Sequence, residues 1–217
     1  MIAALLLLAC AHTGEPTAGV PTAAVPTVTV PTVTVPTVAA PTVAAPTGAV
    51  PSSPAEEAAL ASAQASATRY ATTLRERLVA AMTAGGPPTA VAVCSAEAPA
   101  VAATIVQETT VSVGRSSLRL RNPANAGPVW VQEWLVAQGE RTAEGVAPMA
   151  TVSGGVARVA RPIVVEAPCL ACHGPAETVA PEVRAVLAAQ YPADRATGYA
   201  LGDLRGVLWA EAPVTPN

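Results

Sequence analysis

The spacing of apolar positions predicts that the folded part of the chain begins with a long helix. Ser53-Pro54-Ala55-Glu56 combines an N-cap residue, a proline at the first helical position and an acidic residue for a capping box. A seven-residue repeat of apolar side chains follows, at Leu60, Ala67, Leu74 and Ala81. This repeat indicates an amphipathic helix of about seven turns, which ends at Gly85-Gly86.

A second helical pattern covers about 89–108, with a kink or split at Pro99. Its apolar positions alternate at spacings of three and four residues: Val91, Cys94, Ala98, Val101 and Ile105. The pattern places Cys94 on the face that turns toward the protein interior.

Strands are predicted at 111–114, 150–165 and 204–212, and shorter helices at 133–138 and 181–190. Long helices come first and most strands follow, without a regular alternation of strand and helix. This order favours an α+β fold with an antiparallel sheet.

Proline punctuates the region before this domain. From Pro16 the chain repeats in fives, with units such as PTVTV and PTVAA, and the first 54 residues hold one charged side chain, Glu15. A proline at every fifth position blocks both helix and sheet. We therefore divide the chain into a signal segment (1–10), a disordered proline-rich linker (11–54) and one domain (55–217).

The N-terminus indicates export with a lipid anchor. An apolar run ends in Leu7-Leu8-Ala9-Cys10, which resembles the bacterial lipobox whose cysteine is acylated after cleavage. No Lys or Arg precedes the run, and Leu8 is larger than usual at its position; the alternatives are an ordinary secretory signal or an untranslated stretch. The run at 2–11 is about half the length of a transmembrane helix. We expect a lipoprotein, lipidated at Cys10 and facing the periplasm or the outer cell envelope.

Charge excludes one class of partner. The chain has a net charge of −3, no lysine and no cluster of arginines. A nucleic-acid-binding face needs concentrated positive charge to neutralise phosphates, so we expect no nucleic-acid partner.

The chemistry is concentrated at Cys169-Leu170-Ala171-Cys172-His173. C-x-x-C-H is the attachment signature of a c-type haem, in which two thiols bond the porphyrin and the histidine binds iron. We predict one covalent haem, with His173 as the proximal ligand. Three alternatives remain: a zinc site that includes Cys94, a thioredoxin-like dithiol and a simple disulfide.

A second axial ligand is harder to choose by counting. His12 lies in the linker, so the domain holds no second histidine. Cys94, Met82 and Met149 are the side-chain candidates, and an open or water-bound position is the alternative. Among the arginines, Arg115, Arg119, Arg121 and Arg205 could pair with haem propionates; Arg115 and Arg121 are our tentative choice.

Four separated motifs are similar to a bacterial family of single-haem, PAS-like domains that occur as exported proteins and as sensor ectodomains. They cover about 60–212 and lie at 92–99 (AVCSAEAP), 113–125 (VGRSSLRLRNPAN), 162–174 (PI followed by CLACHG) and 191–206 (YPADRATGY followed by GDLRG). The resemblance implies a PAS-like sheet with N-terminal helices, a haem bonded to Cys169 and Cys172, and His173 with Cys94 as the axial pair.

Two functions follow from a single haem. One is a redox or small-gas sensor that works by exchange of an axial ligand, and the other is a one-electron carrier of the cell envelope. Both need a redox or signalling partner protein that the sequence does not identify. A peroxidase-like enzyme would need a further catalytic histidine, so we expect no enzymatic activity.

Overall fold

The computed structural model describes residues 51–215, so the predicted signal segment, Cys10 and nearly all of the linker lie outside the described residues. The elements are α1 (Pro54–Ala92), the π-helix η1 (Val93–Glu97), α2 (Ala98–Thr109), β1 (Ser112–Ser116), η2 (Pro123–Asn125), α3 (Val129–Gln138), β2 (Met149–Ser153), β3 (Val156–Val164), η3 (Ala167–Cys169), α4 (Leu170–His173), α5 (Pro181–Gln190) and β4 (Leu204–Pro213).

The start of α1 confirms Ser53 as the N-cap, because its hydroxyl accepts a hydrogen bond from the Glu56 backbone N–H at 3.3 Å. Glu56 does not complete the predicted capping box with Ser53. Its carboxylate accepts from the backbone N–H and the hydroxyl of Ser52, both at 2.7 Å. The cap is therefore shared between two neighbouring serines.

Two irregularities divide the helical region. Gly85 and Gly86 have non-helical backbone angles, which confirms the predicted break, although the helix resumes directly and runs on to Ala92. The second irregularity is the π-helix Val93–Glu97, which ends just ahead of Pro99. Cys94 lies inside this π-helix, and Pro99 occupies the first turn of α2.

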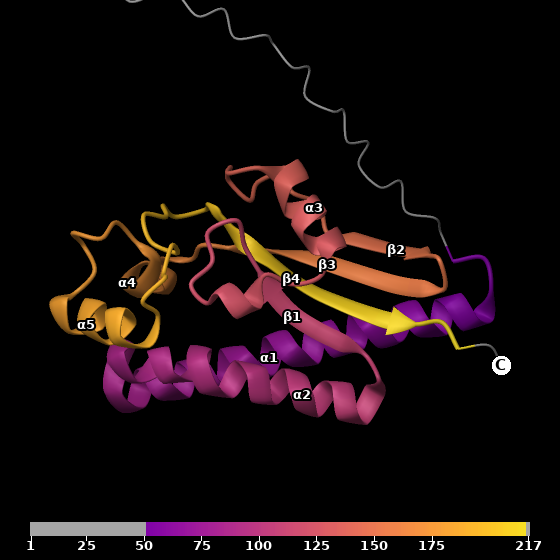
Figure 1. Ribbon diagram of the computed structural model, residues 1–217, viewed down its shortest axis with the longest axis horizontal. Coiled ribbons are helices and arrows are strands. Elements are labelled where there is room, and N and C mark those ends of the chain that lie inside the picture. Colours follow the sequence, from indigo (N-terminus) through magenta and orange to yellow (C-terminus); the bar gives the residue numbers. More distant parts are fainter. Residues whose placement is uncertain (1–50, 216–217) are drawn as a thin grey trace, which may run out of the picture. The chain divides into compact units, whose positions relative to one another are not determined.

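The four strands form one antiparallel sheet in the order β1-β4-β3-β2. β2 and β3 make a hairpin through Gly154 and Gly155, so the strand region predicted at 150–165 is two strands. The antiparallel sheet and the preceding helices confirm the predicted α+β, PAS-like class. α1 and α2 run along one side of this sheet, and α3 lies on the other (Figure 1).

Side chains that alternate along β4 build two cores. Leu208, Ala210 and Ala212 pack with α1, α2 and the facing residues of β1 and β3. Val207, on the opposite face, packs with α3. In α1, the side chains buried against the sheet are Ala59, Ala63, Ala67 and Tyr70. Ala90 and Val91 are buried near the other end of the helix, and Leu78 between the two groups is 39% exposed.

The helical stretch Pro54–Thr109 is apolar enough, by length and composition alone, to cross a membrane; its most apolar window has a mean hydropathy of 1.6. Core helices of globular domains meet the same criterion. Here the first half of the stretch contributes Ala63, Ala67 and Tyr70 to the core over the sheet.

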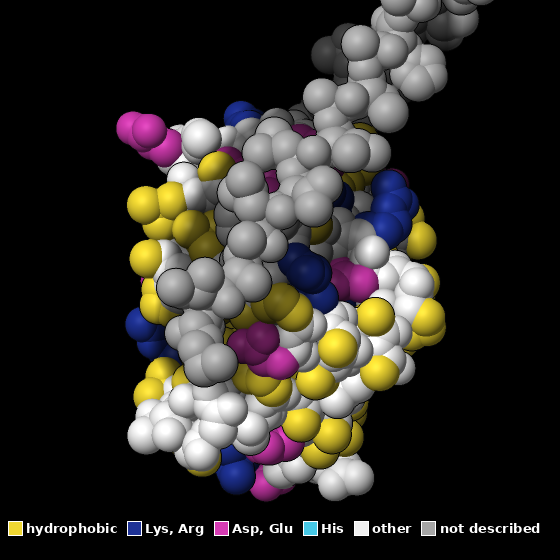
Figure 2. All heavy atoms as spheres, turned by 90° about the vertical axis from the view of Figure 1, so that its left-hand side faces the viewer, with side chains coloured by type: hydrophobic (Ala, Val, Ile, Leu, Met, Phe, Trp, Pro, Cys, Tyr) yellow, Lys and Arg dark blue, Asp and Glu magenta, His cyan; other side chains and the backbone are white. Residues whose placement is uncertain are grey.

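α4 and α5 lie together beyond one end of the sheet, next to the end of α1 (Figure 1). Figure 2 views the molecule from that end, and the face that it shows mixes basic, acidic and hydrophobic side chains.

Gly114 leaves room for the Trp209 ring, and this close approach can be tested. A Cβ at position 114 would lie 2.7 Å from the ring of Trp209. We expect Gly114→Ala to lower the free energy of unfolding by about 1–3 kcal/mol through overpacking. Urea denaturation of the full chain measures this. Ser112→Ala, an exposed change on the same strand, is the control and should stay within about 0.5 kcal/mol of wild type. Equal stability of the two variants would contradict the packing argument.

Candidate functional site

The C-x-x-C-H segment is held as two short helical turns between the end of β3 and α5. Cys169 ends η3, and Cys172 and His173 lie in α4. The Gly174 backbone N–H closes α4 on the Leu170 carbonyl at 3.0 Å. All three side chains are partly buried, so the two thiols and the imidazole lie close together at the boundary of the interior.

His173 is oriented through one ring nitrogen. Nδ1 lies 2.7 Å from the Ala196 carbonyl, which can only accept, so Nδ1 carries the proton and Nε2 is free to bind a metal. Tyr199 packs edge-on to the imidazole with a centroid separation of 6.2 Å. Burial, followed by the positive charges of Arg205 and Arg121, holds the pKa of His173 well below its ordinary value. The imidazole is therefore neutral, the form that coordinates iron.

Cys94 reaches the same region from the π-helix between α1 and α2. Val91, one turn earlier, packs in a cluster with Val183 of α5 and with Cys172. Burial raises the pKa of the Cys172 thiol, Arg121 opposes the rise, and Cys94 adds to it. The helical turn just before Cys94 and the residue Cys172 therefore share one apolar cluster, although they lie far apart in the sequence.

Arg121 ties the loop after α5 to the C-x-x-C-H segment. Its Nε pairs with Asp194 Oδ2 at 3.0 Å, and its Nη2 donates to the carbonyls of Cys172 and Ala196, the latter at 3.3 Å. Asp194 Oδ1 in turn accepts from the Ala196 backbone N–H at 2.7 Å. The side chains of Arg121 and Asp194 are only 9% and 12% exposed, so this is a buried ion pair.

Arg115 and Arg205 are different, because neither has a carboxylate within 4 Å among residues 51–215. Arg115 Nη2 donates to the Cys94 carbonyl at 3.2 Å. The Nε of Arg205 is buried without a hydrogen-bond partner, and burial lowers the pKa of this guanidinium. Two partly buried positive charges therefore lack an anion near His173.

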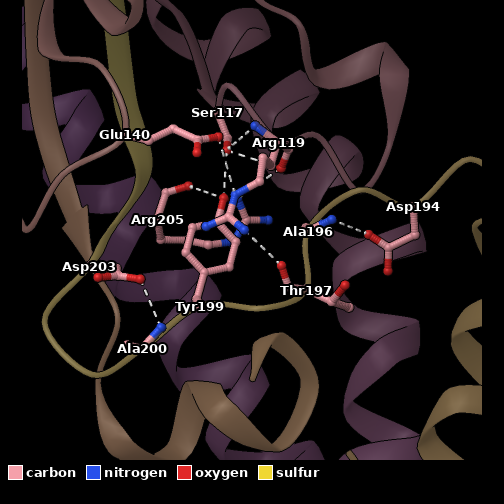
Figure 3. A network of polar contacts seen from close by, with 10 residues as sticks. All are labelled: Ser117, Arg119, Glu140, Asp194, Ala196, Thr197, Tyr199, Ala200, Asp203 and Arg205. Atoms are coloured by element: carbon pink, nitrogen blue, oxygen red, sulfur yellow. Dashed lines mark hydrogen bonds and ion pairs between the residues drawn. The ribbon is translucent and has the colours of Figure 1, made fainter. Parts of the chain in front are cut away.

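Tyr199 is the centre of a polar network drawn in Figure 3. Arg119 stacks on its ring at 3.7 Å and is anchored by the Thr197 carbonyl and by Glu140. The Tyr199 hydroxyl lies 3.2 Å from the Ser117 hydroxyl. A cavity of about 380 Å³ opens beside this network, between Arg119, Arg205 and the loop at 139–142.

The remaining candidates separate into site and core. Tyr191 packs with Cys172, and Tyr199 packs with Cys169 and Leu170, so both tyrosines line the site. Trp130, Trp134, Trp209 and Met149 belong to the core under α3 instead. Asn122 and Asp203 cap turns, as expected for these residues, by accepting from the backbone N–H groups of Ala124 and Ala200.

The donor set fits haem better than the alternatives. No group of three or more His, Cys, Asp or Glu side chains suited to a metal occurs within the described range, whereas tetrahedral zinc needs four ligands. Cys94, Cys169 and Cys172 are free thiols rather than a disulfide. Haem needs two thiols, one or two axial ligands and partners for two propionates, and the free Nε2 of His173 and the unpaired Nε of Arg205 meet such needs.

Asp194, Ala196 and Tyr199 are site residues that the sequence reasoning did not assign. All three lie in the motif at 191–199, which carried the family resemblance but contains no metal-ligating pattern. The position of this motif, shortly after the C-x-x-C-H pattern, was the available signal that its residues contribute to the site.

Comparison with known proteins agrees with the resemblance. The model of the Tll0287-like family matches residues 50–213. A solved structure, that of the cyanobacterial heme-protein Tll0287, is 29% identical over 58% of this chain and 74% of its own, with a TM-score of 0.47. No curated sequence matches the chain. The predicted relation to a haem-binding PAS-like family is confirmed.

The buried pair Arg121–Asp194 should contribute to stability more than an exposed pair does. We expect Asp194→Asn to lower the free energy of unfolding by about 3 kcal/mol, because it leaves the Arg121 charge buried beside a neutral group. Glu108→Gln removes the partner of Arg69, where both side chains are about half exposed, and should cost less than about 1 kcal/mol. Denaturant titration of both variants gives the comparison. Equal losses would show that the pair near His173 is effectively solvated.

Proposed function

Because the chain belongs to the Tll0287-like family, we propose that it is an exported, lipid-anchored protein that carries one covalent c-type haem and has a redox role. The family relation supports haem binding. Covalent attachment, the axial pair, export and the redox role are our inferences from the residues of this chain.

One observation carries the proposal: the helical turn just before Cys94 packs in the same apolar cluster as Cys172. Val91 belongs to this cluster, Cys94 follows in the π-helix, and the bonded Nδ1 of His173 leaves Nε2 as the coordinating atom. These groups would serve one planar cofactor with thioether bonds from Cys169 and Cys172 and with ligands from His173 and Cys94. The cofactor supplies a one-electron couple when bound.

Propionate binding falls to the arginines that have no carboxylate of their own. Arg115 was our sequence choice, and its position next to Cys94 supports that choice. Arg121 is already paired with Asp194, whereas the Nε of Arg205 has no partner. We therefore propose Arg115 and Arg205 as the propionate partners, since a buried guanidinium needs a compensating anion.

A cysteine thiolate opposite histidine favours redox sensing over simple electron storage. Its negative charge stabilises ferric iron, which lowers the reduction potential relative to a Met/His pair, and reduction weakens the iron–sulfur bond. Departure of Cys94 would then free a coordination site for a small gas. Electron transfer at fixed ligation is the alternative, and both functions are non-catalytic.

The axial pair is tested by Cys94→Ala in protein matured with the cytochrome c machinery. We expect wild type to bind haem covalently and to give a low-spin ferric EPR spectrum with thiolate character. The variant should keep the covalent haem and lose that character. Its reduction potential should rise on the order of 100 mV, within the ~0.8 V range that axial ligands span. Redox titration measures the shift.

Met82→Leu and Met149→Leu are the matched controls, since they remove the other candidate ligands. Neither should change the spectrum. A Cys94→Ala protein with the wild-type spectrum and potential would exclude Cys94 as a ligand. An acid-labile haem, or none, would contradict the c-type assignment.

The anchor is tested separately, by fractionation of cells that express the full chain. Wild type should sediment with membranes, and Cys10→Ser should be processed poorly or be released, because acylation needs the thiol. Labelling with a fatty-acid analogue should be lost in the variant. Membrane association and labelling that survive in Cys10→Ser would contradict lipidation at this residue.

A further inference from the structure

The haem-ligating histidine is hydrogen-bonded to a carbonyl that a cation also uses. We propose that Arg121 and Asp194 are positioning residues that set the electron donation of His173 to iron and thereby tune the reduction potential; this role rests on the proposed haem function. Neither residue touches the metal. Both act through the backbone of Ala196: Arg121 contacts its carbonyl, and Asp194 accepts from its N–H.

Three contacts converge on the backbone of Ala196, and a fourth joins Arg121 to Asp194. The Ala196 carbonyl accepts from His173 Nδ1 at 2.7 Å and from Arg121 Nη2 at 3.3 Å. The Ala196 N–H donates to Asp194 Oδ1 at 2.7 Å, and Asp194 Oδ2 pairs with Arg121 Nε at 3.0 Å. Ala196 itself is fully buried, so water does not compete for its carbonyl.

Sharing the carbonyl has a predictable electronic effect. A carbonyl that accepts a strong hydrogen bond from Nδ1–H gives the imidazole partial imidazolate character, which raises the basicity of the metal-bound nitrogen. A guanidinium on the same oxygen withdraws electron density and weakens that bond. Arg121 therefore makes His173 a poorer donor, and this favours ferrous over ferric iron.

The charges act in the same direction as the hydrogen bonds. Arg121 is a positive charge that shares the Ala196 carbonyl with His173 Nδ1, and positive charge disfavours the more positive ferric state. Asp194 carries the opposite charge and offsets this effect. The two residues of the pair therefore have opposite influences on the potential, although both support the same local structure.

Arg121 also fixes the segment that carries the histidine. Its Nη2 donates to the Cys172 carbonyl, one residue before His173. The guanidinium thus joins both sides of the His173–Ala196 hydrogen bond. Loss of the arginine is expected to disturb the ring orientation as well as its basicity, so the charge effect needs a variant that preserves the cation.

The experiment is a spectroelectrochemical titration of the haem-loaded full chain for wild type, Arg121→Gln, Arg121→Lys, Asp194→Asn and the double variant with Gln and Asn. We expect Arg121→Gln to shift the ferric-to-ferrous equilibrium by about tenfold toward ferric, which is about 59 mV for a one-electron couple. Asp194→Asn should shift it in the opposite direction. The double variant should return near wild type, and Arg121→Lys should recover most of the shift.

A second ion pair of the domain provides the matched control. Arg158 on β3 and Glu211 on β4 are cross-strand neighbours. Arg158 Nε lies 3.7 Å from Glu211 Oε2, and both side chains are 29% exposed. Arg158→Gln and Glu211→Gln remove the same charges away from His173. We expect neither to move the potential by more than a small fraction of the shift at 121 or 194.

The hydrogen bond has a readout of its own. In the diamagnetic ferrous–CO complex of the haem-loaded protein, the His173 Nδ1 proton resonance should move downfield in Arg121→Gln, because the Ala196 carbonyl becomes a stronger acceptor. Potentials that shift in the same direction for Arg121→Gln and Asp194→Asn, or an unchanged proton resonance, would overturn the tuning role and leave a purely structural pair. Should Arg121→Gln fail to fold, the direction of the potential shift in Asp194→Asn still tests the charge effect. The potential of Arg121→Lys still tests whether a cation is needed at position 121.

Failure of the underlying function gives a different result. Wild type without covalent haem would contradict the proposed function before any potential is measured. Wild type with haem, together with uniform potentials across the variants, would contradict only the tuning role.

Discussion

The site depends on one buried ion pair, Arg121–Asp194, that joins three distant parts of the chain. Arg121 follows β1, the C-x-x-C-H turn follows β3, and Asp194 follows α5. Besides this pair, the C-x-x-C-H turn is held by the hydrogen bond of His173 to Ala196, by backbone hydrogen bonds from Gly198 and Tyr199, and by small apolar clusters around Tyr191 and Tyr199. A buried ion pair has a precise geometry that apolar packing lacks, because each hydrogen bond must be satisfied where no water is available.

The distribution of charge explains how a domain with a negative net charge can hold an acidic cofactor. Arg121 shares the Ala196 carbonyl with His173, and it is the only one of Arg115, Arg121 and Arg205 with a carboxylate partner among the residues that the structure describes. Burial, followed by the excess of positive charge from Arg205, Arg121 and Arg115, disfavours protonation of His173. The same excess would be neutralised by the two carboxylates of a haem, so a single arrangement favours both a neutral ligand and an anionic cofactor.

Local signals in the sequence were sufficient to predict most elements and to propose a covalent attachment site. Ser53, Gly85-Gly86 and the C-x-x-C-H pattern act over a few residues, so their consequences can be predicted without the fold. The pairing of Arg121 with Asp194 across 73 positions depends on tertiary structure, and no pattern in the sequence specifies it. The chain around Cys94 is a π-helix, although the apolar spacing there predicts an α-helix. The prediction could not detect the π-helix, because a single π-turn does not change the 3, 4, 3, 4 spacing of the apolar residues.

The π-turn determines which surfaces the helical segments before and after it can face. Each residue of an α-helix advances the direction of the side chains by about 100°, so a π-turn rotates everything after it relative to everything before it. Val91 faces α5 and Cys172, whereas Ile105 faces the sheet. A continuous α-helix of regular phase could not direct both residues toward these two surfaces. The extra residue at 93–97 makes the direction of α2 side chains independent of those before it. The sequence of α2 can therefore vary to suit the core without changing the direction in which the Cys94 thiol points.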